Sequence, residues 1–217
     1  GDGAAPQGAL ATPTEAQPLA QADGNMGESG VDPDHSYTLN LAAGQGVWLS
    51  LLPRTSAAGA LSSPTLKVLD SQGALLAEGL NAMGSLYFTA PAEGVYTLRL
   101  GGRGTDRAYR LQAEWEGAPD RLIPHDVALE DHGTPDFPLE YLAGSELPLT
   151  YEGVDSRYQG KPAYVYQMTL PAGARLLTGG DNNAWRTVLL DSQGRETLGL
   201  LAQEAGVYRL VLMAYGP

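Results

Sequence analysis

One pentapeptide occurs twice in the chain, and its flanking residues repeat with it. The sequence "LDSQG" stands at Leu69–Gly73 and again at Leu190–Gly194. Upstream, "YTLNLAAG" from Tyr37 matches "YQMTLPAG" from Tyr166, with the same spacing from tyrosine to glycine. Downstream, "APAEGVYTLRL" matches "AQEAGVYRLVL", and "SGVD" and "EGVD" precede the two copies. A chance match of five residues would not bring matching flanks, so we predict that one module occurs twice in tandem.

Short alternating runs within each copy are typical of β-strands. Apolar and polar residues alternate in "YTLNL", "VWLSL" and "VYTLRL". Turn residues bound these runs, because Gly44 and Gly173 stand where a positive φ is needed and Asp70 and Asp191 begin D-S-Q-G turns. No stretch has convincing helical periodicity. We therefore predict an all-β fold of two tandem antiparallel β-sandwich domains, jelly-roll-like or Ig-like.

The length of 217 residues accommodates two small domains. Residues 1–22 are rich in Ala, Pro, Gly and Gln, which predicts a disordered leader. The first β-sandwich module is predicted over residues 23–117. The second module, over residues 118–217, includes a Pro-rich connecting segment whose runs "DVALE" and "PLEYL" are predicted to supply early strands. No equivalent of the closing run "AYRLQAEW" is found in the second copy, so we expect either an open sheet edge or a replacement strand from Ser145–Gly153.

Composition excludes several classes of function. The net charge of −12 argues against nucleic acid as a partner, because a phosphate backbone requires a basic face. The chain has no cysteine, which excludes disulfides, thiolate metal sites and cysteine catalysis. No apolar run is long enough to span a bilayer, so no transmembrane segment is predicted. A first residue other than methionine, followed by the predicted leader, suggests a removed signal segment and an extracytoplasmic protein of the periplasm, cell surface or secreted fraction.

The order of the predicted strand and turn runs resembles that of a known family. The runs are Y-x-L-x-L-x-A-G, P-x-L-x-V-L-D-x-x-G, A-P-x-x-G-x-Y-x-L and a final Y-x-L, and the first copy carries them at Tyr37–Gly44, Pro64–Gly73, Ala90–Leu98 and Ala108–Trp115. This arrangement is similar to the bacterial pre-peptidase C-terminal domain, and the second copy matches it in part. The resemblance implies a sandwich that accompanies secreted or surface proteins as a non-catalytic appendage aiding secretion, solubility or attachment.

The motifs of common enzymes are not found in the sequence. It contains no G-x-S-x-G elbow, no H-E-x-x-H, no Walker loop and no Rossmann glycine pattern. Our leading hypothesis is a non-catalytic extracytoplasmic binding or structural module that docks on or supports a larger cell-envelope or secreted protein.

An oxygen-rich stretch, "ADGNMGESGVDPDH", supports a second hypothesis. Carboxylate and amide oxygens suit calcium, which takes several hard oxygen ligands, although the stretch does not have the spacing of an EF-hand. The chain would then be a calcium-stabilised module that binds carbohydrate or protein. Simple solvated carboxylates are the other interpretation. The candidate calcium ligands are Asp23, Asn25, Glu28, Asp32 and Asp34.

The only three histidines support a third hypothesis, a copper-dependent redox-protective protein with superoxide dismutase-like activity. Imidazoles are the ligands that copper would choose in a chain without thiols. The acidic net charge would repel an anionic substrate unless Arg103, Arg107 or Arg157 provides a local positive path. Ordinary surface histidines are the other interpretation. The candidate copper ligands are His35, His125 and His132.

The three tryptophans allow two interpretations. Trp48, Trp115 and Trp185 could form an aromatic platform for carbohydrate. Trp48 and Trp185 fall at strand positions, where core packing stabilises the fold by a few kcal/mol per ring, roughly. We therefore expect core packing.

Overall fold

The chain folds into strands and turns. The computed structural model describes residues 5–31, 34–55, 58–79, 85–129, 133–137, 139–143, 156–178 and 185–214. These residues contain no helix, and therefore none long and apolar enough to cross a membrane. The all-β prediction is confirmed. The chain divides into two compact units, Gly1–Pro119 and Asp120–Tyr215.

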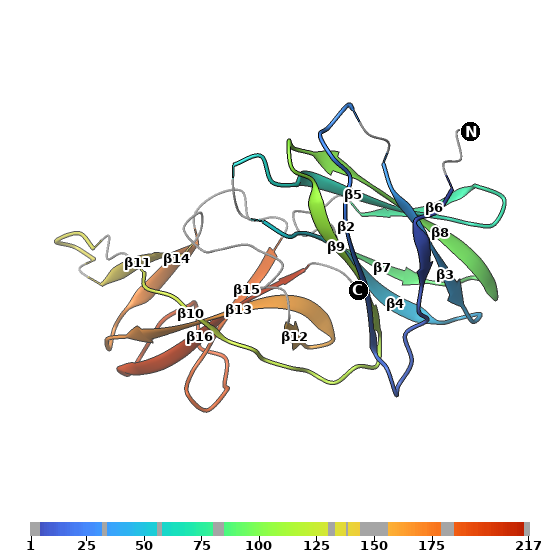
Figure 1. Ribbon diagram of the computed structural model, residues 1–217. Helices are drawn as coiled ribbons and strands as arrows, with labels where there is room; N and C mark the ends of the chain where they lie inside the picture. The colour runs from blue at the N-terminus through green and yellow to red at the C-terminus, as the bar shows by residue number, and fades with distance from the viewer. Residues whose placement is uncertain are drawn as a thin grey trace. The chain divides into compact units, whose positions relative to one another are not determined.

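The first unit is a sandwich of two sheets (Figure 1). One sheet has the strand order β1-β3-β8-β5-β6 and the other has the order β2-β9-β4-β7. All neighbours are antiparallel except β1 and β3, which are parallel. The strands are β1 (Gly8–Leu10), β2 (Leu19–Asn25), β3 (Ser36–Leu41), β4 (Gly46–Pro53), β5 (Ser62–Leu69), β6 (Leu75–Gly79), β7 (Ser85–Thr89), β8 (Gly94–Arg103) and β9 (Ala108–Trp115).

The core of the first unit lies between these sheets. Leu39, Leu66 and Leu98 come from one sheet, Leu49 and Leu111 come from the other, and none is more than 1% exposed. Burial of each leucine stabilises the unit by about 1.5–3 kcal/mol. The alternation in "YTLNL" and "VYTLRL" therefore places one face of each strand in this core.

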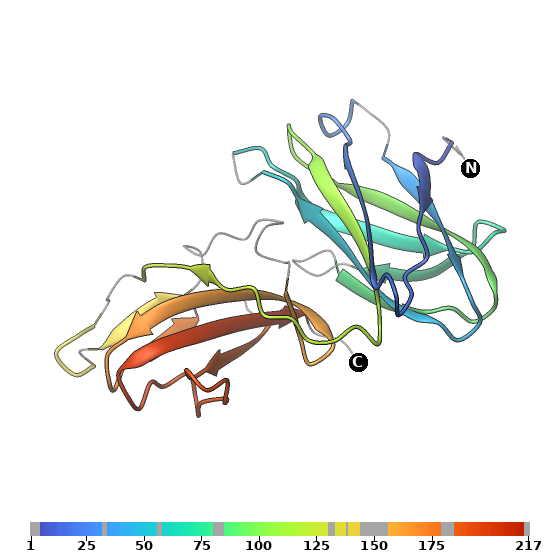
Figure 2. The ribbon, with the colours of Figure 1, turned by 60° about the horizontal axis from the view of Figure 1, so that its bottom comes forward.

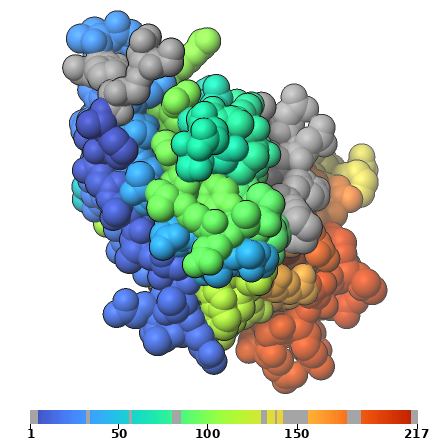
Figure 3. All heavy atoms as spheres, turned by 90° about the vertical axis from the view of Figure 1, so that its right-hand side faces the viewer, coloured from blue at the N-terminus to red at the C-terminus, as the bar shows by residue number. Residues whose placement is uncertain are grey.

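The prediction of a disordered leader over residues 1–22 is corrected for the residues that the structure describes. Gly8–Leu10 forms β1 against β3, and Leu19 begins β2, which pairs with β9. Leu10 and Ala20 are buried in the core. Figure 3 shows these early residues, in blue, packed at the surface of the first unit. Composition misled the prediction because backbone pairing needs few large apolar side chains.

The second unit has a longer sheet and a shorter one. The longer sheet has the order β10-β13-β16-β15, with β12 pairing the start of β13, and the shorter consists of β11 and β14. Figure 2 shows the long strands β13, in orange, and β16, in red, side by side. The strands are β10 (His125–Asp126), β11 (Glu140–Ala143), β12 (Ser156–Tyr158), β13 (Lys161–Leu170), β14 (Arg175–Thr178), β15 (Trp185–Leu190) and β16 (Gly206–Ala214).

The predicted duplication has a counterpart in strand register. Tyr37 pairs with Leu98 in the first unit, and Tyr166 pairs with Leu210 in the second. Leu98 and Leu210 have equivalent neighbours on their other side, in β5 and β15. A parallel strand adjoins the tyrosine in both units, β1 in the first and β10 in the second. Strands β3, β8 and β5 therefore correspond to β13, β16 and β15.

The two D-S-Q-G turns are also the same. The Asp70 carboxylate accepts hydrogen bonds from the amides of Gln72 and Ala74, at 2.9 and 2.8 Å. Asp191 accepts the corresponding bonds from Gln193 and Arg195, at 2.9 and 3.0 Å. Amide donors stabilise the ionised carboxylate, and they help to lower the pKa of Asp191. The repeated pentapeptide is thus a structural turn.

The connecting segment supplies two short strands of the second unit. β11 lies in the run "PLEYL" as predicted, whereas β10 includes only the first residue of "DVALE". β11 pairs directly with β14 in parallel, while the first unit has β9 between β2 and β4. No described strand of the second unit corresponds to β9. The replacement strand predicted from Ser145–Gly153 lies outside the described residues.

One end of the longer sheet of the second unit is buried on both faces, because Pro162–Tyr166 of β13 are all buried whereas Gln167–Leu170 alternate. One face packs Val165, Val188 and Val211 beneath Leu122 and Tyr158 of the connecting segment. The residues at the same ladder positions in the first unit are polar, namely Ser36, Lys67 and Arg99. The second unit therefore uses its connecting segment as part of its core.

A matched pair of core substitutions tests the correspondence. We expect Leu98→Ala and Leu210→Ala each to lower the free energy of unfolding by about 2–5 kcal/mol, because both leucines are fully buried at the same ladder position. Urea unfolding followed by circular dichroism measures both losses. Val95→Ala, at a half-exposed position, is the control and should cost less than about 1 kcal/mol. A loss in only one of the two leucine variants would contradict the correspondence.

Candidate functional site

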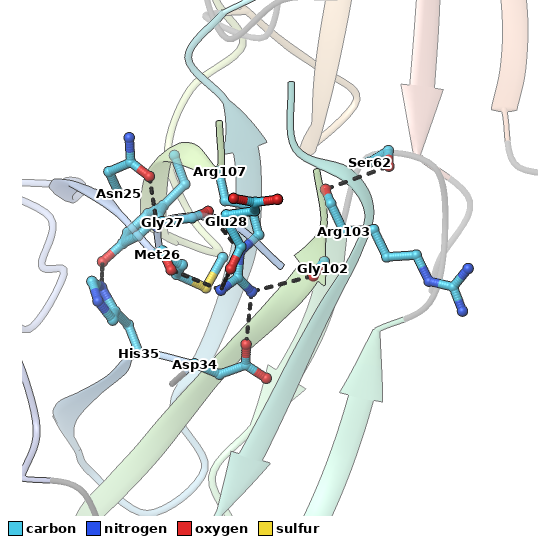
Figure 4. A network of polar contacts seen from close by, with 11 residues as sticks. Asn25, Met26, Gly27, Glu28, Asp34, His35, Ser62, Gly102, Arg103 and Arg107 are labelled. Atoms are coloured by element: carbon cyan, nitrogen blue, oxygen red, sulfur yellow. Dashed lines mark hydrogen bonds and ion pairs between the residues drawn. The ribbon is translucent and has the colours of Figure 1, made fainter. Parts of the chain in front are cut away.

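A buried arginine of the first unit makes several polar contacts. Arg107 stands just before β9 and is 2% exposed. Its guanidinium donates to the carbonyl oxygens of Gly27 at 3.0 Å and Met26 at 2.7 Å. It also donates to the Gly102 carbonyl at 3.3 Å and the Asp34 carboxylate at 2.9 Å (Figure 4). One side chain thus joins the end of β2, the end of β8 and the start of β3.

The acceptors around Arg107 resemble the ligands of a hard cation. Carbonyl oxygens and a carboxylate are groups that calcium prefers, and here a guanidinium donates to them instead. Arginine presents several donors in a fixed plane, so it can satisfy diverging carbonyls together. The turn after β2 is held further by the Asn25 side chain, which accepts from the Gly27 amide at 2.8 Å. This arrangement stabilises the fold of the turn.

A second polar cluster joins three rings in the first unit. The Tyr109 hydroxyl lies 2.7 Å from the Tyr37 hydroxyl and 2.7 Å from His35 Nδ1. The rings of His35 and Tyr37 each meet the Tyr109 ring edge-on. Burial and the bond to Tyr37 raise the pKa of Tyr109 far above its usual value, so the phenol stays neutral. This cluster ties β3 to β9 across the sandwich.

Asp23 belongs to a surface ion cluster on β2. Its carboxylate binds Arg110 through two bonds of 2.7 and 3.0 Å and lies 3.5 Å from Arg54. The hydrogen bond from Arg110 lowers the pKa of Asp23. Both partners are partly exposed, so the ion pair contributes less than about 1 kcal/mol.

The candidate calcium ligands therefore lie in different settings. Asp23 binds Arg110, Asn25 binds the Gly27 amide and Asp106, and Asp34 binds Arg107. Glu28 is exposed, and Asp32 lies outside the described residues. Within the described parts of the chain, no three His, Cys, Asp or Glu side chains are grouped closely enough to hold a metal ion. The calcium site stays a prediction.

The candidate copper ligands are also in different settings. His35 is partly buried in the tyrosine cluster of the first unit, while His125 lies on β10 of the second. His132 lies outside the described residues. The copper site stays a prediction.

Trp48 is buried as expected, but on the face of β4 opposite the inter-sheet core residues Val47 and Leu49. Trp48 is 3% exposed and lies 5.2 Å from the Tyr87 ring. Trp115 is partly buried at the end of β9. The side chain of Trp185 is outside the described part of the structure.

The second unit has a hollow beside its D-S-Q-G turn. The hollow has a volume of about 430 Å³ and lies between the turn at Asp191 and the start of β16. Leu198 and Val207 line it and are 82% and 43% exposed. Arg195 and Glu196 add charges of both signs to its lining.

A smaller cavity of about 240 Å³ adjoins the β11–β14 sheet. Arg175 lies over the Phe137 ring at 5.1 Å and pairs with Glu140. Phe137 is 54% exposed. This cavity and the hollow share Leu201, so the exposed apolar residues gather around one part of the second unit.

The sequence does not single out the two side chains that join strands in the first unit. Arg107 is predicted there only as a possible local positive charge, and Tyr109 only as part of the closing run "AYRLQAEW". The signal for Arg107 would have been its place directly before a strand whose pattern is otherwise apolar on one face. Its acceptors are backbone carbonyls, which no residue motif records.

Known structures resemble parts of this chain, but with low sequence identity and low TM-scores. No protein-family model matches the chain, and no curated protein matches its sequence. A pre-peptidase C-terminal domain of collagenase from Bacillus anthracis is similar at 18% identity and a TM-score of 0.39, over 52% of this chain and 100% of that one. Aeromonas hydrophila PliG, a periplasmic inhibitor of g-type lysozyme, is similar at 18% identity and a TM-score of 0.36, over 49% of this chain and 96% of that one.

Removal of the buried guanidinium should destabilise the first unit. We expect Arg107→Ala to lower the free energy of unfolding by about 3–5 kcal/mol, because Asp34 and the carbonyls lose their donors. Arg107→Lys should recover only part of this loss, because an ammonium cannot span the same acceptors. Arg110→Ala, which breaks a surface ion pair, is the matched control at less than about 1 kcal/mol. Urea unfolding of the three variants measures the free energies of unfolding. Equal losses for Arg107→Ala and Arg110→Ala would contradict the stabilising role of Arg107.

Chelation should leave the thermal stability of the first unit unchanged. Arg107 already supplies positive charge and donors to Asp34 and to the carbonyls of the turn after β2. We expect the same unfolding midpoint in EDTA and in millimolar calcium, measured by scanning calorimetry. A midpoint that falls in EDTA and returns with calcium would instead support the calcium hypothesis.

Proposed function

We propose that the chain is a non-catalytic pair of β-sandwiches that works outside the cytoplasm and docks on a larger cell-envelope or secreted protein through its second unit. The observation that supports this proposal is a difference between the two copies in the segment after the D-S-Q-G turn. In the first unit, the chain after the D-S-Q-G turn forms β6 and β7 before it reaches Ala90. In the second unit, the shorter segment Glu196–Leu201 takes their place before Ala202.

The segment that replaces β6 and β7 begins and ends as in the first copy. It begins at the D-S-Q-G turn and ends at an alanine whose carbonyl accepts from a glycine amide. Ala90 accepts from the Gly44 amide at 2.7 Å, and Ala202 accepts from the Gly173 amide at the same distance. Between these fixed ends, Leu198 is held out from the surface at 82% exposed. An isolated exposed leucine is ordinary, but this one lines a hollow together with Val207. The segment therefore supports a docking role.

The polar groups of the first unit support a structural role for that unit. Arg107, Tyr109 and His35 are engaged in bonds that join strands. The motif resemblance to pre-peptidase C-terminal domains supports the extracytoplasmic setting, since such domains accompany secreted and surface proteins. In this proposal, the first unit is the stable base and the second unit provides the contact surface.

Site-specific photo-cross-linking tests the proposal. A benzoylphenylalanine at Leu198 of the full chain is expected to form one discrete product with an envelope or secreted protein of the source organism. The reason is that the side chain stands at the exposed rim of the hollow. Cross-linking is read from gels and mass spectrometry of the product.

The matched control places the same probe at Leu75, which is 52% exposed on β6 of the first unit. The proposal predicts no discrete product there. Leu198→Asp should reduce binding of the identified protein at least about tenfold, as expected for loss of an apolar contact at an interface. Equal products at both positions, or none at Leu198, would contradict docking through the second unit.

A further inference from the structure

The edge strand of the longer sheet differs between the two units. In the first unit β5 has β8 on one side and β6 on the other. In the second unit β15 pairs with β16 on one side. On its other side, the described residues that pair with it are Arg195–Thr197, which reach only Leu189–Asp191. Arg186–Val188 therefore has no described strand where β6 would continue.

The hydrogen bonds of the turn show which backbone groups face this edge. The Leu189 carbonyl accepts from the Thr197 amide at 2.8 Å, so the polar groups of Leu189 point away from β16. Backbone groups alternate along an antiparallel strand. The N–H and C=O of Thr187 therefore face the same edge as those of Leu189, while those of Val188 face β16.

We propose that an extended segment of the partner protein adds to the sheet beside Arg186–Val188 of β15, antiparallel to it, and continues the strand begun by Arg195–Thr197 as the later residues of β6 do in the first unit. This inference rests on the proposed docking function and names how docking occurs. An exposed strand edge is a template for pairing with another chain, and main-chain hydrogen bonds then provide affinity.

The first unit indicates the chemistry of the added segment. β6 places Ala77 and Gly79 opposite Val68 and Leu66, and its Glu78 lies 3.9 Å from Lys67. We therefore expect small or apolar residues at the corresponding positions of the added segment. In the second unit the exposed cation on β15 is Arg186, so an acidic side chain in the partner segment would complement it.

A second copy of this chain suits the edge less well. Each copy carries a net charge of −12, so two copies repel one another at low ionic strength. Residues Arg195–Thr197 also pair with the last residues of β15, which limits how far two β15 strands could overlap. The partner segment is therefore assigned to another protein.

Amide hydrogen exchange of the full, ¹⁵N-labelled chain is the first test. We expect the Thr187 amide to exchange at least about 100-fold faster than the Val188 amide, which is bonded within the sheet. Sedimentation velocity of the same sample should show a monomer. Slow exchange of Thr187 in a monomer would mean that the chain covers its own edge, and slow exchange in a dimer would mean that a second copy does. Either result would overturn the proposal.

A peptide with the sequence of residues 77–82, "AEGLNA", capped at both ends, is the probe for strand addition, because in the register of β6 it begins where Arg195–Thr197 end and reaches Val188 and Thr187. We expect it to bind with a dissociation constant on the order of 1 mM and to slow the exchange of Thr187 about threefold or more near saturation. Thr187→Pro removes the outward N–H and should abolish this protection. In the register of β6 the peptide's glutamate lies opposite Val188 and diagonal to Arg186, so Arg186→Glu keeps the backbone and should weaken binding by reversing that nearby charge. A scrambled peptide is the control.

Each outcome of the peptide test is decisive. Protection at Thr187 that is lost in Thr187→Pro and reduced in Arg186→Glu supports strand addition. Equal binding by the scrambled peptide, or no binding at millimolar concentrations, overturns it. If the Leu198 probe still cross-links to one protein in that case, docking stands and only the strand-addition mode is wrong.

Discussion

The hydrogen-bonded ladder around β8 in the first unit, and around β16 in the second, is the constraint on which the rest of the structure depends. Both central strands hold their two neighbours in the same register. A shift of one residue would turn every buried side chain outward, so the ladder tolerates little change. Differences between the copies are accordingly found at the sheet edges and in the connections. That distribution is why the second unit can be remodelled at β15 and still retain its core.

Both units bury polar side chains, since Arg157 of the second unit is also fully buried, but the units differ in where their exposed apolar residues lie. In the first, the guanidinium of Arg107 and the hydroxyl of Tyr109 are buried and join strands that are distant in sequence. Such groups are costly to bury, and satisfied hydrogen bonds offset that cost. In the second, the exposed apolar residues Leu198 and Phe137 are found beside hollows. The first arrangement favours a rigid sandwich, and the second favours contact with a partner.

Sequence alone predicted the all-β class and the duplication, because alternation and repeated turns are local signals. The turn role of Asp70 and Asp191 followed from the same signals. The leader was misjudged because β1 and β2 are held by pairing with distant strands rather than by their own composition. Arg107 could not be placed because its acceptors are carbonyls of residues far away in sequence. Among the described residues, the lack of a neighbour on one side of Arg186–Val188 emerges only from a comparison of registers, which the folded chain supplies.

The most direct measurement of the central claim is partner binding by a grafted chain. In it, Glu196–Leu201 of the second unit is replaced by the corresponding residues of the first, Leu75–Thr89. The graft gives the second unit its own β6 and β7, so β15 is covered and Leu198 is removed. The account predicts that the grafted chain folds, with a core as stable as before, and no longer binds the protein that cross-links at Leu198. Undiminished binding by the folded graft would contradict the claim that this remodelled edge is the docking surface.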